Sequence, residues 1–192
     1  MTHGPVDELL ALYRSPPAAA PYDERVTECD HALQCADRAI EAGAPDMLVV
    51  AALFHDIGHL VPGGAALETT PAATGAVNLP EVDDRHERAG SRLLRRWFTA
   101  DVTAPVALHV EAKRYLCGVD EGYASSLSSS SVHTLALQGG AMTGDEVAAF
   151  RRRRGWADAV ELRRWDDAAK VAGAATRTLD DHRDRIAAVL AG

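Results

Sequence analysis

Residues 47–59, Met47 to His59, read MLVVAALFHDIGH and give the strongest indication of the fold. An uninterrupted apolar run of this kind is typical of a buried helix. It ends in adjacent His55 and Asp56, so the helix brings an imidazole and a carboxylate toward the core. Burying a charged carboxylate is costly unless it is paired or bound to a metal ion. The stretch therefore indicates an internal metal site or, alternatively, a polar helix end at the surface that Gly58 terminates.

Composition and charge exclude several classes of protein. A chain of 192 residues can form one domain with its own core. No apolar run reaches the roughly 18 residues that a membrane span needs. The N-terminus lacks a signal pattern, so we expect a cytoplasmic protein. The net charge of -8 argues against nucleic-acid binding, and the three scattered cysteines form neither a disulfide framework nor a zinc motif.

The apolar periodicity predicts an all-α fold, a single helical bundle over residues 1–192 with a core of about 27–171. A short helix over 6–14 and a loop over 15–26 precede this core, and a mostly solvated closing helix over 172–192 follows it. Within the core, Thr27 and Asp30 fit a capping box that begins a helix. Further helices are expected over 45–56, 86–97, from near Pro105 and over 156–170, with a weakly patterned loop from 62 to about 82.

Histidines recur on the inward faces of these predicted helices. His31 borders an apolar stripe, and His86 lies on the buried stripe of its own helix. His109 also faces inward, with Lys113 one turn beyond it on the same face. One inward histidine is more often a satisfied core residue than a ligand, but several on separate helices indicate a metal site. Imidazole with carboxylate suits iron, zinc or manganese, and Asp56 could bridge two ions about 3.5–4 Å apart.

The order H…HD…H…H…D across residues 31–166 resembles the HD-domain superfamily of metal-dependent phosphohydrolases and oxygenases. The resemblance is more specific to a branch of mixed-valent diiron oxygenases, which cleave the carbon–phosphorus bond of 1-hydroxyphosphonates. The stretches that carry it are YDERVT at 22–27, HALQCA at 31–36, AALFHDIGH at 51–59, LHVEAKRYL at 108–116, SVH at 131–133, LQGG at 137–140 and RRWDDAAK at 163–170.

This resemblance implies an HD-domain helical bundle with a dinuclear iron site, Fe(II)/Fe(III), in its core. Six side chains would hold the two ions. One ion would take His31, His55, Asp56 and Asp166, and the other would take Asp56 as a bridge with His86 and His109. Asp167 is the alternative to Asp166, and helical phase leaves the choice between them open.

The resemblance also implies roles in substrate binding and catalysis. Lys113 would bind a phosphonate oxygen as a point charge, with Ser131, Gln138 and Arg163 as further contacts. Loop capping is the alternative for Ser131 and Gln138. The other implied residues are His59, which would contact the substrate, and Tyr22 and Glu24, a pair on a loop beside the open iron. Read without the resemblance, these three are an exposed histidine and ordinary loop residues.

The function implied is an O2-dependent dioxygenase of organophosphonate catabolism. Its substrate would be 2-amino-1-hydroxyethylphosphonate or an N-methylated relative, which gives a carboxylate such as glycine and inorganic phosphate. One alternative is an HD phosphohydrolase acting on a phosphate ester or nucleotide, and another is a helical binding module without activity. No membrane, nucleic-acid or obligatory protein partner is expected. The sequence leaves open the substituent of the substrate, the identity of the metal and the oligomeric state.

Overall fold

The computed structural model describes residues 4–22, 26–61 and 83–191. These residues are largely helical and contain no β-strand, only an isolated bridge between Pro21 and Thr27. The helices are α1 (Pro5–Tyr13), η1 (Pro16–Ala19), α2 (Glu28–Glu41), α3 (Asp46–Leu53), η2 (Ile57–Leu60), α4 (His86–Leu94), α5 (Ala100–Val119), α6 (Tyr123–Ser126), α7 (Ser129–Leu137), α8 (Gly144–Phe150), α9 (Trp156–Ala168), η3 (Asp180–His182) and α10 (Arg183–Ala188). The predicted all-α fold is confirmed.

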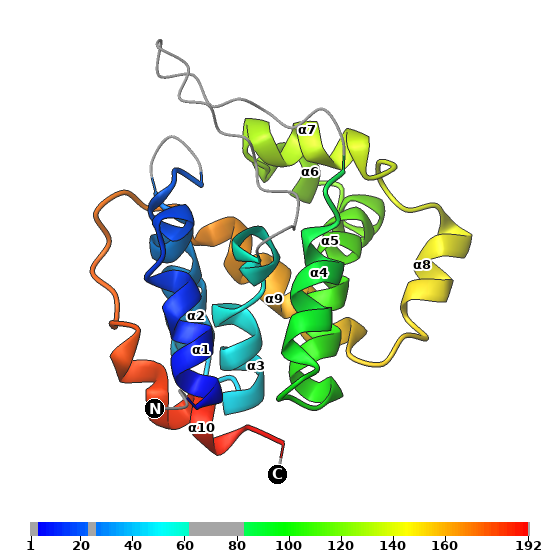
Figure 1. The fold of residues 1–192 in the computed structure, drawn as a ribbon. Coiled ribbons are helices and arrows are strands. Elements are labelled where there is room, and N and C mark those ends of the chain that lie inside the picture. Colours follow the sequence, from blue (N-terminus) through cyan, green and yellow to red (C-terminus); the bar gives the residue numbers. More distant parts are fainter. Residues whose placement is uncertain (1–3, 23–25, 62–82, 192) are drawn as a thin grey trace.

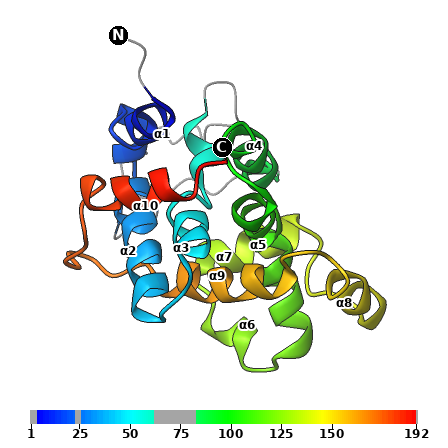
Figure 2. The same ribbon diagram turned by 90° about the horizontal axis from the view of Figure 1, so that it is seen from below.

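The helices are arranged around α3. It packs between α2 on one side and α5 on the other, and α4 packs against α5 (Figure 1). Seen from below, α9 runs across α2, α3 and α5, and it contacts all three (Figure 2). This arrangement brings α2, α4, α5, α9 and the end of α3 around one interior space.

The burial of α3 explains its sequence. Every residue from Leu48 to Leu53 is buried, so no face of the helix needs polar side chains. These residues belong to the larger apolar core, which α1, α2, α5 and α10 complete. A second apolar group lies between α5, α8 and α9, where Tyr115, Phe150 and Trp156 pack their rings together.

Some helix boundaries differ from the prediction. The capping box at the start of α2 is present, with the Asp30 amide donating to Thr27 Oγ1 over 3.1 Å. The predicted helix start near Pro105 is wrong, because α5 begins at Ala100 behind the N-cap Thr99. Pro105 therefore lies inside α5, where its missing amide leaves one helical carbonyl without its usual partner.

The two ends of the core also differ. The predicted helix over 45–56 ends at Leu53, and a turn leads from it into η2. The predicted closing helix over 172–192 is instead an irregular segment followed by η3 and α10. Most residues of this segment are exposed, as predicted, but Ile186 and His182 are fully buried and fix it to the core.

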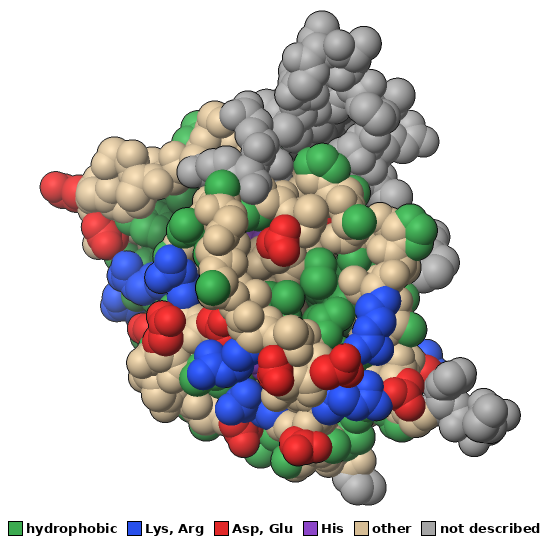
Figure 3. Space-filling view, turned by 90° about the vertical axis from the view of Figure 1, so that its left-hand side faces the viewer, with side chains coloured by type: hydrophobic (Ala, Val, Ile, Leu, Met, Phe, Trp, Pro, Cys, Tyr) green, Lys and Arg blue, Asp and Glu red, His purple; other side chains and the backbone are tan. Residues whose placement is uncertain are grey.

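The face formed by α1, α2 and α10 carries basic and acidic side chains in alternation (Figure 3). Ion pairs on this face include Arg14, just after α1, with Asp180 of η3, and Arg183 of α10 with Asp7 of α1. Such exposed pairs contribute little stability each. Among the residues described, no helix combines the length and the apolar character needed to cross a bilayer.

Candidate dinuclear metal centre

The turn after α3 places His55 and Asp56 in the interior. His55 is fully buried and Asp56 is 5% exposed. The His55 Nδ1 atom donates a hydrogen bond to the carbonyl oxygen of Ala52 over 2.8 Å, which fixes the ring against the last turn of α3. Neighbouring residues on a regular helix do not face each other. Because the chain leaves α3 at Leu53, both side chains can turn toward one space.

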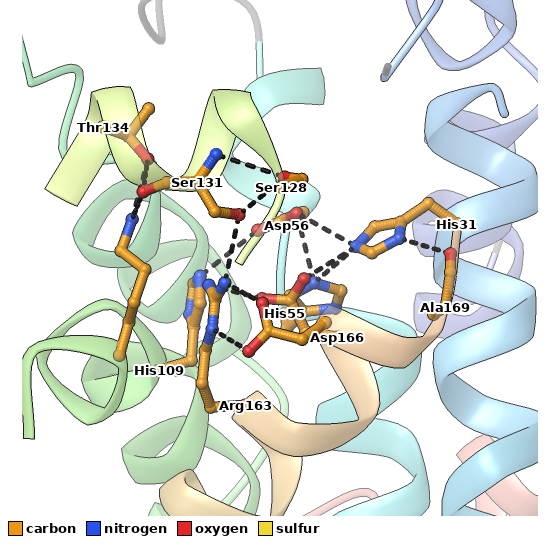
Figure 4. A network of polar contacts seen from close by, with 12 residues as sticks. His31, His55, Asp56, His109, Ser128, Ser131, Thr134, Arg163, Asp166 and Ala169 are labelled. Atoms are coloured by element: carbon orange, nitrogen blue, oxygen red, sulfur yellow. Dashed lines mark hydrogen bonds and ion pairs between the residues drawn. The ribbon is translucent and has the colours of Figure 1, made fainter. Parts of the chain in front are cut away.

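His55 forms a first cluster with His31 from α2 and Asp166 from α9, all of them buried. The Nε2 atoms of His31 and His55 lie 3.1 Å apart. Asp166 Oδ1 lies 3.4 Å from His31 Nε2. On its other side, His31 Nδ1 donates to the carbonyl oxygen of Ala169 over 2.9 Å. Figure 4 shows these side chains converging from three separate elements.

A second cluster joins Asp56 to His86, the first residue of α4, and to His109 on α5. The Nε2 atoms of the two histidines are again 3.1 Å apart. The Nδ1 atom of each ring also has an acceptor. His109 Nδ1 lies 2.8 Å from the carbonyl oxygen of Val106, and His86 Nδ1 lies 2.7 Å from Asp84 Oδ1. In both clusters, therefore, the Nδ1 atoms of the histidines face oxygen acceptors and their Nε2 atoms face each other.

Asp56 lies between the clusters and offers one oxygen to each. Its Oδ2 atom is 3.1 Å from His55 Nε2 and 3.6 Å from His31 Nε2. Its Oδ1 atom is 3.2 Å from His86 Nε2 and 3.3 Å from His109 Nε2. This is the arrangement that a carboxylate bridging two metal ions requires.

The donor atoms fit a pair of metal ions. In all four histidines Nδ1 faces an oxygen acceptor, so Nδ1 holds a proton and Nε2 is the atom that can present a lone pair to a metal ion at the centre. The Oδ1 atoms of Asp56 and Asp166 are buried without a hydrogen-bond partner among the described residues. Facing lone pairs and buried carboxylates need positive charge between them. Metal binding supplies that charge, and the ligand types suit iron, zinc or manganese.

The pKa values of the second cluster show the same demand for positive charge. Burial alone would lower the pKa of His86, but its contacts with Asp56 and Asp84 raise it to about 10. Burial lowers the pKa of His109 to about 4, despite Asp56. This pair therefore holds one additional proton near neutral pH. A metal ion would replace that proton, so its binding should release it.

The choice between Asp166 and Asp167 is visible in their contacts. Asp166 is 1% exposed and belongs to the first cluster, and its Oδ2 atom lies 2.7 Å from Arg163 Nη1. The carboxylate of Asp167 instead accepts hydrogen bonds from Arg163 and from the hydroxyl of Tyr123. The structure therefore places Asp166, and not Asp167, among the histidines.

Two basic side chains, those of Lys113 and Arg163, lie beside the clusters and together form what we call the basic wall. Lys113 is 2% exposed, and its Nζ atom donates to Thr134 Oγ1 over 2.7 Å and lies 3.5 Å from the carbonyl oxygen of Ser131. Arg163 Nη2 lies 3.4 Å from Ser131 Oγ, a contact visible in Figure 4. Burial, together with Arg163, lowers the pKa of Lys113 to about 7. Among the described residues no carboxylate lies within ion-pair distance of Lys113.

The remaining predicted residues are placed unequally. The Tyr22 ring stacks on His31, with centroids 3.8 Å apart and planes 9° from parallel. His59 stacks on His86, with centroids 4.1 Å apart. Gln138 follows α7, and its Oε1 atom is buried without a hydrogen-bond partner among the described residues. Glu24 lies outside the described residues.

Comparison with known proteins agrees with this geometry. The HD domain family matches residues 29–128. The chain is 40% identical over 169 residues to the hydroxymethylphosphonate dioxygenase of Gimesia maris, which covers 88% of this chain and 80% of that protein. This chain belongs to the HD-domain family. Within the family it belongs to the branch of these phosphonate dioxygenases, as the sequence resemblance predicted.

Two further relatives of this HD-domain protein are informative. The [1-hydroxy-2-(trimethylamino)ethyl]phosphonate dioxygenase (glycine-betaine-forming) of Leisingera caerulea is 38% identical over 77% of this chain and 70% of that protein. An uncharacterized protein of Acanthamoeba polyphaga mimivirus is 28% identical over 93% of this chain and 78% of that protein. The two named dioxygenases act on phosphonates that differ in the group attached to the hydroxylated carbon.

Three residues of this HD-domain protein that contact or face its centre escaped the sequence analysis. Asp84 lies two residues before His86, and this spacing was the only signal for it. Thr134 holds Lys113, but nothing in its pattern distinguished it from a capping residue. Glu28, in the first turn of α2, is 5% exposed. Burial raises the pKa of Glu28 to about 7, although the nearby His59 opposes the change.

Proposed function

We propose that this chain is an O2-dependent diiron dioxygenase that cleaves the carbon–phosphorus bond of a 1-hydroxyalkylphosphonate. The products would be a carboxylate and inorganic phosphate. The observation that carries the proposal is the position of Asp56, which offers one oxygen to each of two histidine pairs. It occurs in a chain that is 40% and 38% identical to two named phosphonate dioxygenases.

Six residues would hold the two ions, in two sets that share Asp56. The first set is His31, His55, Asp56 and Asp166, and the second is Asp56, His86 and His109. Two iron ions, as Fe(II)/Fe(III), would supply the one-electron chemistry that activates O2, which side chains alone do not provide, while the electrons that reduce O2 would come overall from the hydroxylated carbon of the substrate. Both sets lie in the interior, so bulk water has little access to them.

The basic wall would bind the phosphonate group. The ammonium of Lys113 is buried beside hydroxyl and carbonyl groups only, so an incoming dianion would supply its missing counter-charge. Ser131 lies between this ammonium and the guanidinium of Arg163, where its hydroxyl could donate to a phosphonate oxygen. Arg163 is already paired with Asp166 and Asp167, so its share would be mainly electrostatic.

Tyr22 and His59 lie on two sides of the centre. The Tyr22 ring covers His31, and burial followed by the charge of Asp166 raises the pKa of Tyr22, so its hydroxyl remains protonated. It would exclude water from the first set of ligands until the substrate displaces it. His59 lies against His86 and would contact the hydroxyl or phosphonate group of the substrate.

The group attached to the hydroxylated carbon determines which substrate is preferred. We propose 2-amino-1-hydroxyethylphosphonate, giving glycine, or an N-methylated relative. A cation there would be attracted by the predicted Glu24 and by Glu28, a carboxyl group buried in the first turn of α2. Hydroxymethylphosphonate carries no cationic group on its hydroxylated carbon, so it is the substrate with which the amine-bearing phosphonate must be compared.

The test is aerobic incubation of the iron-loaded protein with these phosphonates, following O2 uptake and phosphate release. We expect phosphate to appear only when O2 is consumed, and electron paramagnetic resonance to detect a mixed-valent iron pair. Asp56→Asn should abolish both the phosphate release and the mixed-valent signal, because it weakens the ligand that the two sets share. Asp37→Asn is the matched control, since Asp37 pairs with Arg177 away from the centre.

Other outcomes would refute the proposal in different ways. Hydrolysis of phosphate esters or nucleotides without O2 would make the chain an HD phosphohydrolase. No turnover with iron, manganese or zinc would favour a binding module that keeps the HD core for stability. A cytoplasmic location and the absence of an obligatory protein partner remain predictions from the sequence.

A further inference from the structure

Asp84 contacts two histidines with its two carboxylate oxygens. Its Oδ1 atom lies 2.7 Å from His86 Nδ1 and accepts the backbone N–H of His86 over 3.2 Å. Its Oδ2 atom lies 3.1 Å from His59 Nδ1. The carboxylate therefore meets the same ring atom of both histidines, and the two rings are stacked 24° from parallel.

The backbone beside Asp84 adopts an unusual conformation. Arg85 has a φ of 54°, the only left-handed non-glycine residue among those described. L residues rarely adopt this conformation. It allows α4 to begin directly at His86, where Asp84 accepts the first amide of the helix and lies beside the imidazole of the same residue. The conformation of the segment thus holds the carboxylate of Asp84 against His86.

The contact with His86 has a chemical consequence for that ring. An oxygen acceptor at Nδ1 keeps a proton on that atom, so Nε2 is the atom that can bind a metal ion. The Nε2 atom of His86 faces the centre, 3.1 Å from that of His109. The Nδ1 atom of His59 lies within hydrogen-bond distance of Asp84 without hydrogen-bond alignment, so this contact limits where the ring lies but does not fix its tautomer.

We propose that Asp84 is a positioning residue that orients His86 toward the second metal ion and His59 toward the substrate. The part that concerns His59 rests on the proposed function, whereas the part that concerns His86 does not. Removing such a partner of a metal-bound histidine typically weakens metal affinity by roughly 10- to 100-fold. Replacing Asp84 should therefore weaken the binding of the second metal ion and the binding of the substrate.

The first experiment measures zinc binding, without phosphonate or O2. Asp84→Asn keeps an oxygen for the amide of His86 but removes the charge, and Asp83→Asn is the matched control, since its described contact is with the Arg85 amide at 3.4 Å. We expect two zinc ions in wild type and in Asp83→Asn. In Asp84→Asn the second ion should bind roughly 10- to 100-fold more weakly and the first unchanged.

Several zinc results would overturn the proposal. Unchanged affinity for both ions in folded Asp84→Asn would show that Asp84 does not orient His86. Three ions in wild type and two in the variant would make Asp84 a ligand of a further ion, held with His59 and His86. A single ion in wild type would remove the site that Asp84 is proposed to serve.

The second experiment measures binding of hydroxymethylphosphonate to protein saturated with zinc. Asp84→Asn and His59→Ala should each weaken binding, and the double variant should be no weaker than His59→Ala alone, because both changes remove one interaction. Independent, multiplying effects would refute the link to His59. The two proposals can fail separately. If Asp84→Asn loses the second zinc ion but the wild-type protein never releases phosphate, the proposed function is refuted and the role of Asp84 at His86 stands.

Discussion

Replacing Lys113 with Met tests whether the basic wall exists for an anion. Lys113 is almost fully buried, and its ammonium contacts Thr134 and the backbone of Ser131 instead of a carboxylate. A buried cation of this kind destabilises the protein that carries it. Met has a similar shape and no charge, so Lys113→Met should stabilise the protein without ligand and weaken its binding of phosphonate.

The pKa of Lys113 sets the size of the effect. Burial, with Arg163, lowers it from 10.5 to about 7. The unfolded chain therefore binds the proton more tightly than the folded protein between these pH values. The cost to folding is absent above pH 10.5, grows as the pH falls, and is complete below about 7, where it reaches about 5 kcal/mol. Removing the lysine should recover up to that amount at pH 6.

The assay is equilibrium unfolding in urea of metal-free protein at pH 6 and pH 10. We expect Lys113→Met to be more stable than wild type at pH 6 and the difference to shrink at pH 10. Its zinc-loaded form should bind hydroxymethylphosphonate roughly 10- to 100-fold more weakly. Arg92→Met, at an exposed position on α4, is the control and should change neither property. If the variant is less stable than wild type at pH 6, or binds phosphonate as wild type does, Lys113 is not a destabilising cation that serves an anion.

Three other substitutions have clear expectations. Glu28→Gln should stabilise metal-free protein by an amount that grows between pH 4.5 and about 7 and stays near about 3 kcal/mol above that, because burial raises the pKa of Glu28 from 4.5 to about 7. A gain that is the same at pH 4 and pH 8 in urea unfolding would contradict this. Gly58→Ala should lower the free energy of unfolding by about 3 kcal/mol, because the added Cβ would lie 2.0 Å from the carbonyl oxygen of His86. The control Gly144→Ala, whose Cβ meets nothing within 4 Å, should not. Glu24→Gln should raise the KM of an amine-bearing phosphonate more than that of hydroxymethylphosphonate, and equal increases would remove its predicted role.

The helices could be predicted because their signals are local. Apolar spacing and the Thr27–Asp30 capping box depend on residues within a turn or two of each other. The errors arose where local signals compete. Pro105 is typical of a helix start, but the Thr99 cap begins α5 earlier. The apolar run through Phe54 predicted a longer helix, but α3 ends at Leu53.

The side chains that could serve a metal centre can be predicted without coordinates, since the spacing of apolar residues gives the direction of each histidine from its own helix. Which of these side chains meet depends on how the helices pack. The packing of the helices placed Asp166 rather than Asp167 beside His31 and brought His109 on α5 to His86 on α4. The physical reason is that periodicity fixes an angle around one helix axis, whereas a distance of about 3 Å between ligand atoms depends on how separate helices pack.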